Sequence, residues 1–180
     1  LKSHLATLPA PQTRRYETEV NLAALRWIDA VARTLMKGFV VAVDYGFARD
    51  EFYAPHRTTG TLQCRARHHV VESPLAQIGE ADITAHVEWT SVAERAIAAG
   101  FQLMGFTDQH HFITGLLDGV AANEFNAESD PKSTRALQTL LHPGFLGMKF
   151  QFLVLGRNVE GGAQLSGLRF TRDARKALML

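Results

Sequence analysis

The segment from Gly79 to Trp89 carries three polar side chains that could act together in catalysis. Asp82, Thr84 and His86 alternate with apolar residues, so an extended strand would present all three on one face. A helix would instead place Asp82 and His86 four residues apart on the same side. In both cases a carboxylate, a hydroxyl and an imidazole converge, and such a group can orient and deprotonate a nucleophile. The sequence leaves open the alternative of a polar strand edge on which Asp82 caps a turn.

The tripeptide Asp44-Tyr45-Gly46 is a second candidate. It follows residues 39–43, a continuous apolar run directly after a glycine, which is typical of a strand buried on both faces of a parallel sheet. We therefore expect Val41 to be fully buried. Ligands of open α/β sheets bind at the carboxyl ends of the strands, so the tripeptide is a candidate ligand-binding turn. Alternatively, Asp44 only caps the turn and Gly46 supplies a positive φ.

Several functional classes have no motif in the chain. There is no dinucleotide fingerprint, no P-loop and no serine-hydrolase elbow. The single cysteine, Cys64, is interpreted as an inert thiol. The histidines include the adjacent pairs 68–69 and 110–111, whose side chains diverge, so we expect no metal site. No stretch reaches the roughly 20 apolar residues of a membrane span, so we expect no membrane partner.

Charge is unevenly distributed along the 180 residues, although the net charge is only +1. Residues 46–131 hold five basic and twelve acidic residues, whereas residues 132–180 hold eight basic and two acidic ones. A basic end can bind nucleic acid or an acidic partner. No run of basic residues exceeds two and no nucleic-acid module is visible, so we favour a solvated surface and expect no nucleic-acid partner.

Helical and extended patterns alternate along the chain and predict an α/β fold. The spacing of apolar residues predicts helices over Thr18–Lys37, over Ser91–Ala99 with Ser91 as N-cap, over His110–Leu117 and over Ser133–Leu141. Further strands are expected at 101–106 and 149–155, with an edge piece at 165–171. Residues 47–81 show no sustained period apart from a short strand within Thr59–Arg67, and residues 1–16 are expected to be an irregular lead-in.

Taken in chain order, five motifs resemble the second half of the MidA family of class I S-adenosylmethionine-dependent methyltransferases. The resemblance runs from about residue 17 to about residue 157. The motifs are Asp44-Tyr45-Gly46, Gly60-Thr61-Leu62, Gly79-x-x-Asp82-Ile83-Thr84-Ala85-His86-Val87, Thr107-Asp108-Gln109-x-x-Phe112-Ile113 and Gly147-Met148-Lys149-Phe150. The mitochondrial member of the family is implicated in complex I assembly as a protein arginine methyltransferase.

The resemblance implies the carboxyl-terminal part of a Rossmann-like methyltransferase sheet with a long insertion after the fifth strand. Residues 39–43, 101–106 and 149–155 would be the fifth, sixth and seventh strands, the last two antiparallel. Residues 17–157 would form this part, with 47–81 as an insertion near the substrate pocket and 158–180 as an edge strand and basic tail. The cofactor would be S-adenosylmethionine, its main site is expected before Leu1, and we expect the isolated chain to be inactive.

The function implied is methylation of a protein, plausibly at arginine. We assign Asp82 to orient the guanidinium and His86 to accept the proton. The expected substrate pocket comprises Asp44, Tyr45, Gly46, Thr61, Thr84 and Gln109. The alternative is a non-catalytic interaction module that retains part of the methyltransferase fold.

Partners other than a protein substrate are not defined by the sequence, and a homodimer stays open. We expect a bacterial cytoplasmic location rather than the mitochondrial matrix, because no Arg/Ser-rich transit segment is present.

Overall fold

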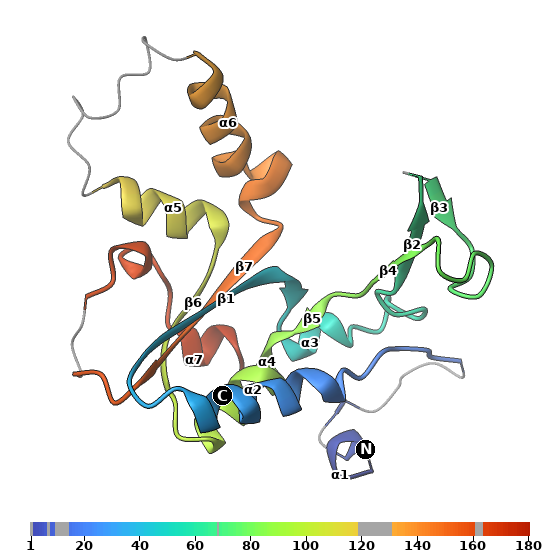
Figure 1. Cartoon of the computed structure of the whole chain (residues 1–180), viewed down its shortest axis with the longest axis horizontal. Coiled ribbons are helices and arrows are strands. Elements are labelled where there is room, and N and C mark those ends of the chain that lie inside the picture. Colours follow the sequence, from blue (N-terminus) through green and yellow to red (C-terminus); the bar gives the residue numbers. More distant parts are fainter. Residues whose placement is uncertain (1, 7, 10–14, 68, 119–130, 161–163) are drawn as a thin grey trace.

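A four-stranded sheet with helices on both faces forms the body of the protein (Figure 1). The computed structural model describes residues 2–6, 8–9, 15–67, 69–118, 131–160 and 164–180. The strand order is β5-β1-β7-β6. The strands are β1 (Gly38–Phe47), β5 (Val87–Glu88), β6 (Gln102–Asp108) and β7 (Phe150–Arg157). The predicted α/β class is therefore confirmed.

Strand β7 lies at the centre of this sheet. It pairs antiparallel with β1 over Gly38–Tyr45 and antiparallel with β6 over Gln102–Asp108. Leu153, Val154 and Leu155 have no exposed surface. The predicted antiparallel pairing of the last two strands is confirmed, and each is within three residues of its expected bounds.

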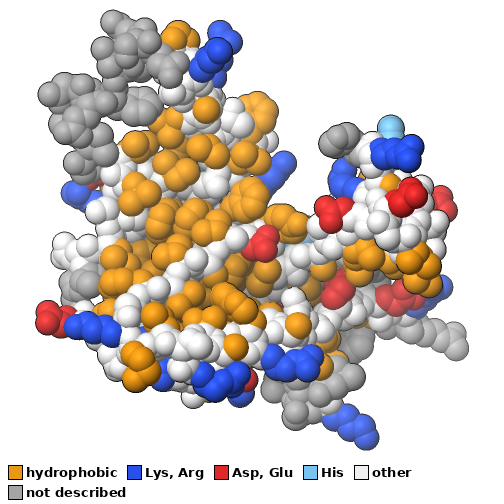
Figure 2. Space-filling view, viewed as in Figure 1, with side chains coloured by type: hydrophobic (Ala, Val, Ile, Leu, Met, Phe, Trp, Pro, Cys, Tyr) orange, Lys and Arg blue, Asp and Glu red, His pale blue; other side chains and the backbone are white. Residues whose placement is uncertain are grey.

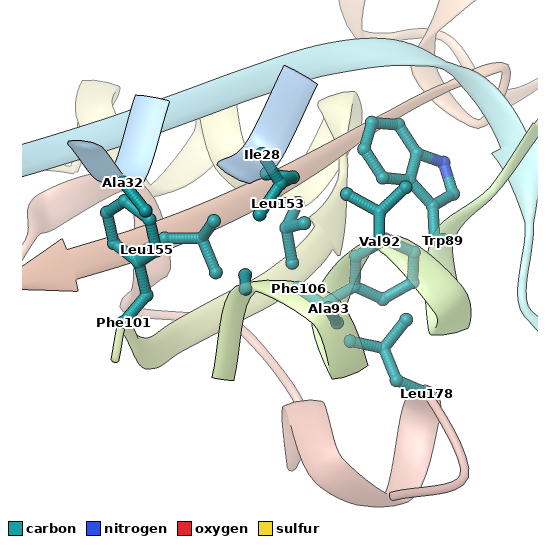
Figure 3. Close-up of a cluster of buried hydrophobic side chains, with 11 residues drawn as sticks. Ile28, Ala32, Trp89, Val92, Ala93, Phe101, Phe106, Leu153, Leu155 and Leu178 are labelled. Atoms are coloured by element: carbon teal, nitrogen blue, oxygen red, sulfur yellow. The ribbon is translucent and has the colours of Figure 1, made fainter. Parts of the chain in front are cut away.

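Helices α2 (Leu22–Thr34) and α4 (Trp89–Ala98) cover one face of the sheet and form the core with it (Figure 3). The core residues are Ile28, Ala32, Trp89, Val92, Ala93, Ala96, Phe101, Phe106, Leu153, Leu155 and Leu178. Leu178 follows α7 (Ala174–Ala177), so the carboxyl end of the chain closes the core. Arg95 of α4 donates two hydrogen bonds of 2.7 Å to the Asp29 carboxylate, which joins the two helices.

The expectation that residues 39–43 are buried on both faces is wrong. Val40 and Ala42 pack against the core, but Phe39, Val41 and Val43 are 40%, 50% and 44% exposed. The only strand that pairs in parallel with β1 among the described residues is β5, at Gly46 and Phe47. This half-exposed face of β1 is apolar. Figure 2 shows hydrophobic side chains gathered over the middle of the molecule.

Helix ends and one predicted strand also differ from the expectations. Helix α2 begins at Leu22 rather than Thr18, because the Asn21 side chain accepts a hydrogen bond from the Ala24 N–H. The N-cap of α4 is Glu88, whose carboxylate accepts the Ser91 N–H, so Ser91 lies inside the helix. The predicted edge strand at 165–171 is instead a 3-10 helix, η2 (Ser166–Leu168). A short helix, α1 (Lys2–Leu5), lies in the expected irregular lead-in.

The segment expected to be an insertion, 47–81, contributes two of the three strands of a small antiparallel sheet that stands beside the main one, and the third strand directly follows it (Figure 1). Its order is β3-β2-β4, with β2 (Gln63–Ala66), β3 (His69–Val71) and β4 (Asp82–Thr84). The short helix α3 (Arg49–Phe52) connects β1 to this sheet. The short strand expected within 59–67 is therefore confirmed as β2, while β3 had no clear period in the sequence.

The remaining helices lie between β6 and β7 in the chain, at the same end of the strands as the carboxyl end of β1 (Figure 1). They are α5 (Gln109–Leu117), α6 (Pro131–Leu141) and the π-helical turn η1 (Pro143–Gly147). Phe112 of α5 stacks on Phe152 of β7 with ring centroids 4.1 Å apart. Within the described ranges, the helices are too short or too polar to cross a membrane.

Two adjacent substitutions test which face of β1 is covered. Val40→Asp places a charge against the core and should lower the free energy of unfolding by at least about 2 kcal/mol. Val41→Asp lies on the half-exposed face and should lower it by less than about 1 kcal/mol. Urea denaturation followed by circular dichroism measures both. Equal losses would show that the Val41 face is covered in solution.

Candidate functional site

A cavity of about 990 Å³ lies where the end of β1 meets the small sheet. Tyr45, Gly46 and Phe47 of β1 form one wall, and Thr84 and His86 form another. The volume is within the range of ligand-binding pockets in proteins, roughly 300–1,000 Å³. The other lining residues are Ala48, Glu51, Gln63, Arg65, Phe106, Leu146, Met148, Lys149, Phe150, Gln151, Arg172 and Ala177.

The imidazole of His86 lies between two aromatic rings of β1. It stacks on the Phe47 ring with a centroid distance of 5.0 Å and an angle of 13° between the ring planes. It also forms an edge contact with the Tyr45 ring at a centroid distance of 5.1 Å. Tyr45 and Phe47 flank the same imidazole because side chains two residues apart on a strand share a face. Phe150 extends the series beyond Tyr45 at 5.9 Å, and the Arg57 guanidinium covers Phe47 at 4.3 Å.

The surroundings of His86 favour the neutral imidazole by lowering its pKa. Burial lowers its pKa most, and the nearby Arg57 cation lowers it further. The hydrogen bond with Thr61 and the charges of Glu19 and Asp44 oppose this, but the net direction is downward. The Nδ1 atom is buried and has no hydrogen-bond partner among the described residues. Because His86 lines the cavity and its lowered pKa favours the unprotonated ring, it is a candidate proton acceptor.

The carboxylate of Glu19 connects the start of the chain to His86. It accepts the backbone N–H of Thr61 at 2.9 and 3.0 Å and that of Leu62 at 2.7 Å. The Thr61 hydroxyl donates to the Glu19 carboxylate at 3.3 Å and accepts a hydrogen bond from the backbone N–H of His86 at 3.0 Å. Gly60 has a φ of +72°, and a Cβ there would lie 2.3 Å from Glu19 Oε1, so a larger residue would displace the carboxylate. Glu19 is thus a positioning residue for His86.

The tripeptide Asp44-Tyr45-Gly46 lies within β1 and not in a turn after it. Both parts of the alternative interpretation are therefore wrong: Gly46 does not have a positive φ, and Asp44 accepts a hydrogen bond from the adjacent Tyr45 N–H instead of capping a turn after the strand. Glycine is needed because a Cβ at position 46 would lie 2.2 Å from the Val87 carbonyl oxygen and 2.7 Å from Trp89 Nε1. This close approach is what lets β5 pair with the end of β1.

The predicted site residues fall into two groups. Tyr45, Gly46, Thr84 and His86 line the cavity, and Thr61 contacts His86 from behind it. Asp44, Asp82 and Gln109 are not among the lining residues.

Asp82 and Gln109 have other surroundings. Asp82 is exposed and pairs in register with Arg65. It does not follow Thr84 and His86 into the cavity, because β4 ends at Thr84 and the predicted alternation does not extend through His86. Gln109 is buried, and its amide donates to the Leu140 carbonyl at 2.9 Å, which joins α5 to α6. The catalytic assignments of Asp82 and His86 stay predictions.

Sequence reasoning missed several residues of the cavity. Phe47 could have been found, because it follows Tyr45 at the strand period of two. Lys149 and Phe150 belong to the last of the five motifs but were not assigned to the pocket. Glu51 and Arg172 gave no such signal, since they reach the cavity from segments far apart in the chain. Glu19 also stands alone in an irregular segment, and only folding brings it to residues 60–62.

A smaller cavity of about 180 Å³ adjoins the first and shares Phe106, Met148, Gln151, Arg172 and Ala177 with it. His111 Nδ1 lies 2.8 and 2.9 Å from the two oxygens of Asp108 there. The described residues contain no group of three or more His, Cys, Asp or Glu side chains that could hold a metal ion.

The fold and the cavity together define an α/β protein with a candidate ligand-binding space at the end of the sheet. Residues 1–107 match the family described as "Putative S-adenosyl-L-methionine-dependent methyltransferase". The chain therefore belongs to this methyltransferase family. The matched region contains β1, the small sheet and His86.

Two crystal structures of proteins from Burkholderia thailandensis, assigned to one superfamily, are similar to the chain. One is an uncharacterized protein with 29% identity and a TM-score of 0.84, and the match covers 97% of this chain and 46% of that one. The other is bound to S-adenosyl-homocysteine and has 28% identity, a TM-score of 0.84 and coverages of 97% and 45%. The chain thus spans a little under half the length of these relatives. No curated protein matches the chain.

The positioning role of Glu19 can be tested against a neighbouring carboxylate. Glu19→Gln weakens charge-assisted hydrogen bonds to two backbone N–H groups and should lower the free energy of unfolding by about 1.5–3 kcal/mol. Glu17→Gln removes a largely exposed carboxylate that pairs with Arg15, and should change it by less than about 0.5 kcal/mol. Urea denaturation compares them. A Glu19 variant as stable as the Glu17 variant would contradict the network.

The lowered pKa of His86 should make stability depend on pH. The folded state binds a proton to His86 less readily than the unfolded state does, so stability rises with pH up to about 6.5, the ordinary histidine pKa. Lowering the pH from 7.5 to 5.5 should therefore destabilise the wild type more than His86→Gln. His56→Gln, at an exposed position, is the control and should behave as wild type. An identical pH response of wild type and His86→Gln in urea titrations would contradict this.

Proposed function

We propose that the chain is the acceptor-side part of an S-adenosylmethionine-dependent methyltransferase that acts on a protein. The observation that carries the proposal is the coincidence of the family match with the cavity: Tyr45, Phe47 and His86 all lie within residues 1–107. The relative bound to S-adenosyl-homocysteine, which matches 97% of the chain, supports the same reaction class.

The described residues fit a site for the methyl acceptor better than a site for the cofactor that donates the methyl group. The cofactor supplies a methyl group on a sulfonium sulfur, which a nucleophile can displace with release of S-adenosyl-homocysteine. After β1 the chain turns at Ala48 into the four-residue helix α3, with no side-chain cap hydrogen bond, and neither this turn nor the one after β6 is glycine-rich. We therefore assign no residue of this chain to hold the cofactor.

The side chains of the cavity suit a nitrogen nucleophile. A guanidinium or amine must lose a proton as it is methylated, and the neutral His86 can accept it. The carboxylate that lines the cavity is Glu51, which can hold a guanidinium in a bidentate pair. We propose arginine as the acceptor on this basis. Asp82, predicted for the orienting role, lies outside the cavity lining, so the geometry favours Glu51.

A second candidate function is a non-catalytic interaction module. The exposed apolar side chains Phe39, Val41 and Val43 on the uncovered face of β1 favour it, because such faces commonly mark protein contacts. Both functions can coexist in one protein, so the test must measure methyl transfer itself.

The proposal predicts transfer of tritium from labelled S-adenosylmethionine to protein by the complete polypeptide that carries this chain. Glu51→Gln should reduce the rate about a hundredfold, the scale for a positioned acid–base group, while Asp82→Asn should stay within about threefold of wild type. Both positions are exposed, so neither variant should shift the melting temperature by more than about two degrees.

Each outcome is informative. Hydrolysis of the labelled protein should yield methylarginine, and methyllysine instead would change the acceptor but keep the function. If Asp82→Asn lowered the rate of methyl transfer strongly and Glu51→Gln did not, Asp82 and not Glu51 would be the residue that orients the acceptor. If no tritium were incorporated into any acceptor, the methyltransferase proposal would be contradicted and the interaction module would be favoured.

A further inference from the structure

Three cationic side chains surround the main cavity. Arg65 comes from the small sheet, Lys149 directly precedes β7, and Arg172 precedes α7. All three are exposed, and none forms an ion pair with a residue in the part of the chain that the structure describes. Glu51 is the one carboxylate among the lining residues.

The acidic residues near these cations are largely engaged elsewhere. Asp108 binds His111, and Asp173 caps α7 by accepting the N–H groups of Arg175 and Lys176. Asp82 lies opposite Arg65 in the β2–β4 register and offsets that cation in part. Among the charged residues that line the cavity, Arg65, Lys149 and Arg172 outnumber the single carboxylate of Glu51.

We propose that this cationic rim, formed by Arg65, Lys149 and Arg172, binds an acidic polypeptide segment that flanks the methylated residue. The inference deepens the proposed function and rests on it for the methylated residue, but the binding step does not require methyl transfer. Exposed cations at the mouth of a cavity attract an anionic partner and orient it, and they do so less at high ionic strength.

The charges explain how a cationic side chain could enter this cavity. A guanidinium alone would meet three like charges at the rim before it reached Glu51. Aspartate or glutamate residues on either side of it would offset that repulsion, so the flanking sequence contributes to selection. Specificity of this kind depends on like charges that reject the wrong partner as well as on attractive ones.

A polypeptide fits the geometry better than a nucleic acid. The three cations lie around a hollow walled by Tyr45 and Phe150, and come from separate segments of the chain. A single-stranded nucleic acid is bound by a groove of cations that follows its backbone, with exposed rings for its bases. The rings of Tyr45 and Phe47 are in contact with His86.

Fluorescence anisotropy with labelled peptides and the 180-residue chain tests the proposal. One peptide has a central arginine between three acidic residues on each side, a second replaces these by their amides, and a third replaces them by lysine. At about 50 mM salt the acidic peptide should bind at least about tenfold more tightly than the amide peptide, and the difference should shrink at about 300 mM salt.

Charge reversal supplies a matched control. The double variant Lys149→Glu and Arg172→Glu should bind the acidic peptide at least about tenfold more weakly than wild type does. It should bind the lysine peptide more tightly than wild type does. The double variant Arg175→Glu and Lys176→Glu changes the net charge equally on the exposed helix α7, outside the cavity lining, and should stay within about twofold. Thermal melting confirms that both variants are folded.

Three results would overturn the inference: equal binding of acidic and amide peptides, equal loss in both double variants, or tighter binding of a labelled oligonucleotide than of the acidic peptide. The proposed function is tested separately, by tritium transfer. Methyl transfer without preferential binding of the acidic peptide would contradict only the role of the cationic rim. Preferential binding of the acidic peptide without methyl transfer would contradict the proposed function and favour a binding module.

Discussion

The pairing of β7 on both of its edges is the constraint on which the rest of the structure depends. Its backbone N–H and C=O groups are used by β1 on one side and β6 on the other, and its centre has no exposed surface. A strand in this position must be apolar on both faces, because an unpaired polar group there would be costly. Strand β1 is then held at one edge by a ladder of eight residue pairs, so its far end and the residues that line the cavity have a defined position.

A second set of contacts places the small sheet against that end. The Glu19 carboxylate holds the backbone at Thr61, and the Thr61 hydroxyl holds the backbone at His86. Arg49 adds a connection at the start of the segment, since its guanidinium donates to Glu94 of α4 and its backbone N–H donates to the Thr90 hydroxyl at 3.0 Å. The imidazole is therefore positioned from two directions, by hydrogen bonds behind it and by the rings of β1 around it. This arrangement keeps His86 beside the cavity, and its burial lowers the imidazole pKa.

The two faces of β1 have different consequences for function. The Val40 face completes the core, while the Val41 face is apolar and open among the described residues. An open apolar face and a cationic cavity rim on one body are compatible with a protein that contacts other polypeptide both through burial and through charge. The family match places the chain in the family described as "Putative S-adenosyl-L-methionine-dependent methyltransferase", and the lining of the cavity contains three cationic side chains and one carboxylate.

The sequence alone determined most of the local elements and the membership in a methyltransferase family; the narrower resemblance to MidA stays a prediction. Apolar spacing predicted α2, α4, α5 and α6, and the β-branched run after Gly38 predicted β1, because these signals depend on neighbours within one turn or one strand. It also identified Tyr45, Gly46, Thr84 and His86, four residues that line the cavity.

Tertiary structure decided the rest. An apolar run has the same composition whether one face or both are covered, so the exposure of Val41 depended on what packs above it. The alternation from Asp82 to His86 indicated a shared face, but the strand ended at Thr84 and left Asp82 exposed beside Arg65. Glu19, Glu51, Lys149 and Arg172 reach the site from segments far apart in the chain, and their proximity is a property of sheet order and loop paths. Local periodicity carries no information about such contacts.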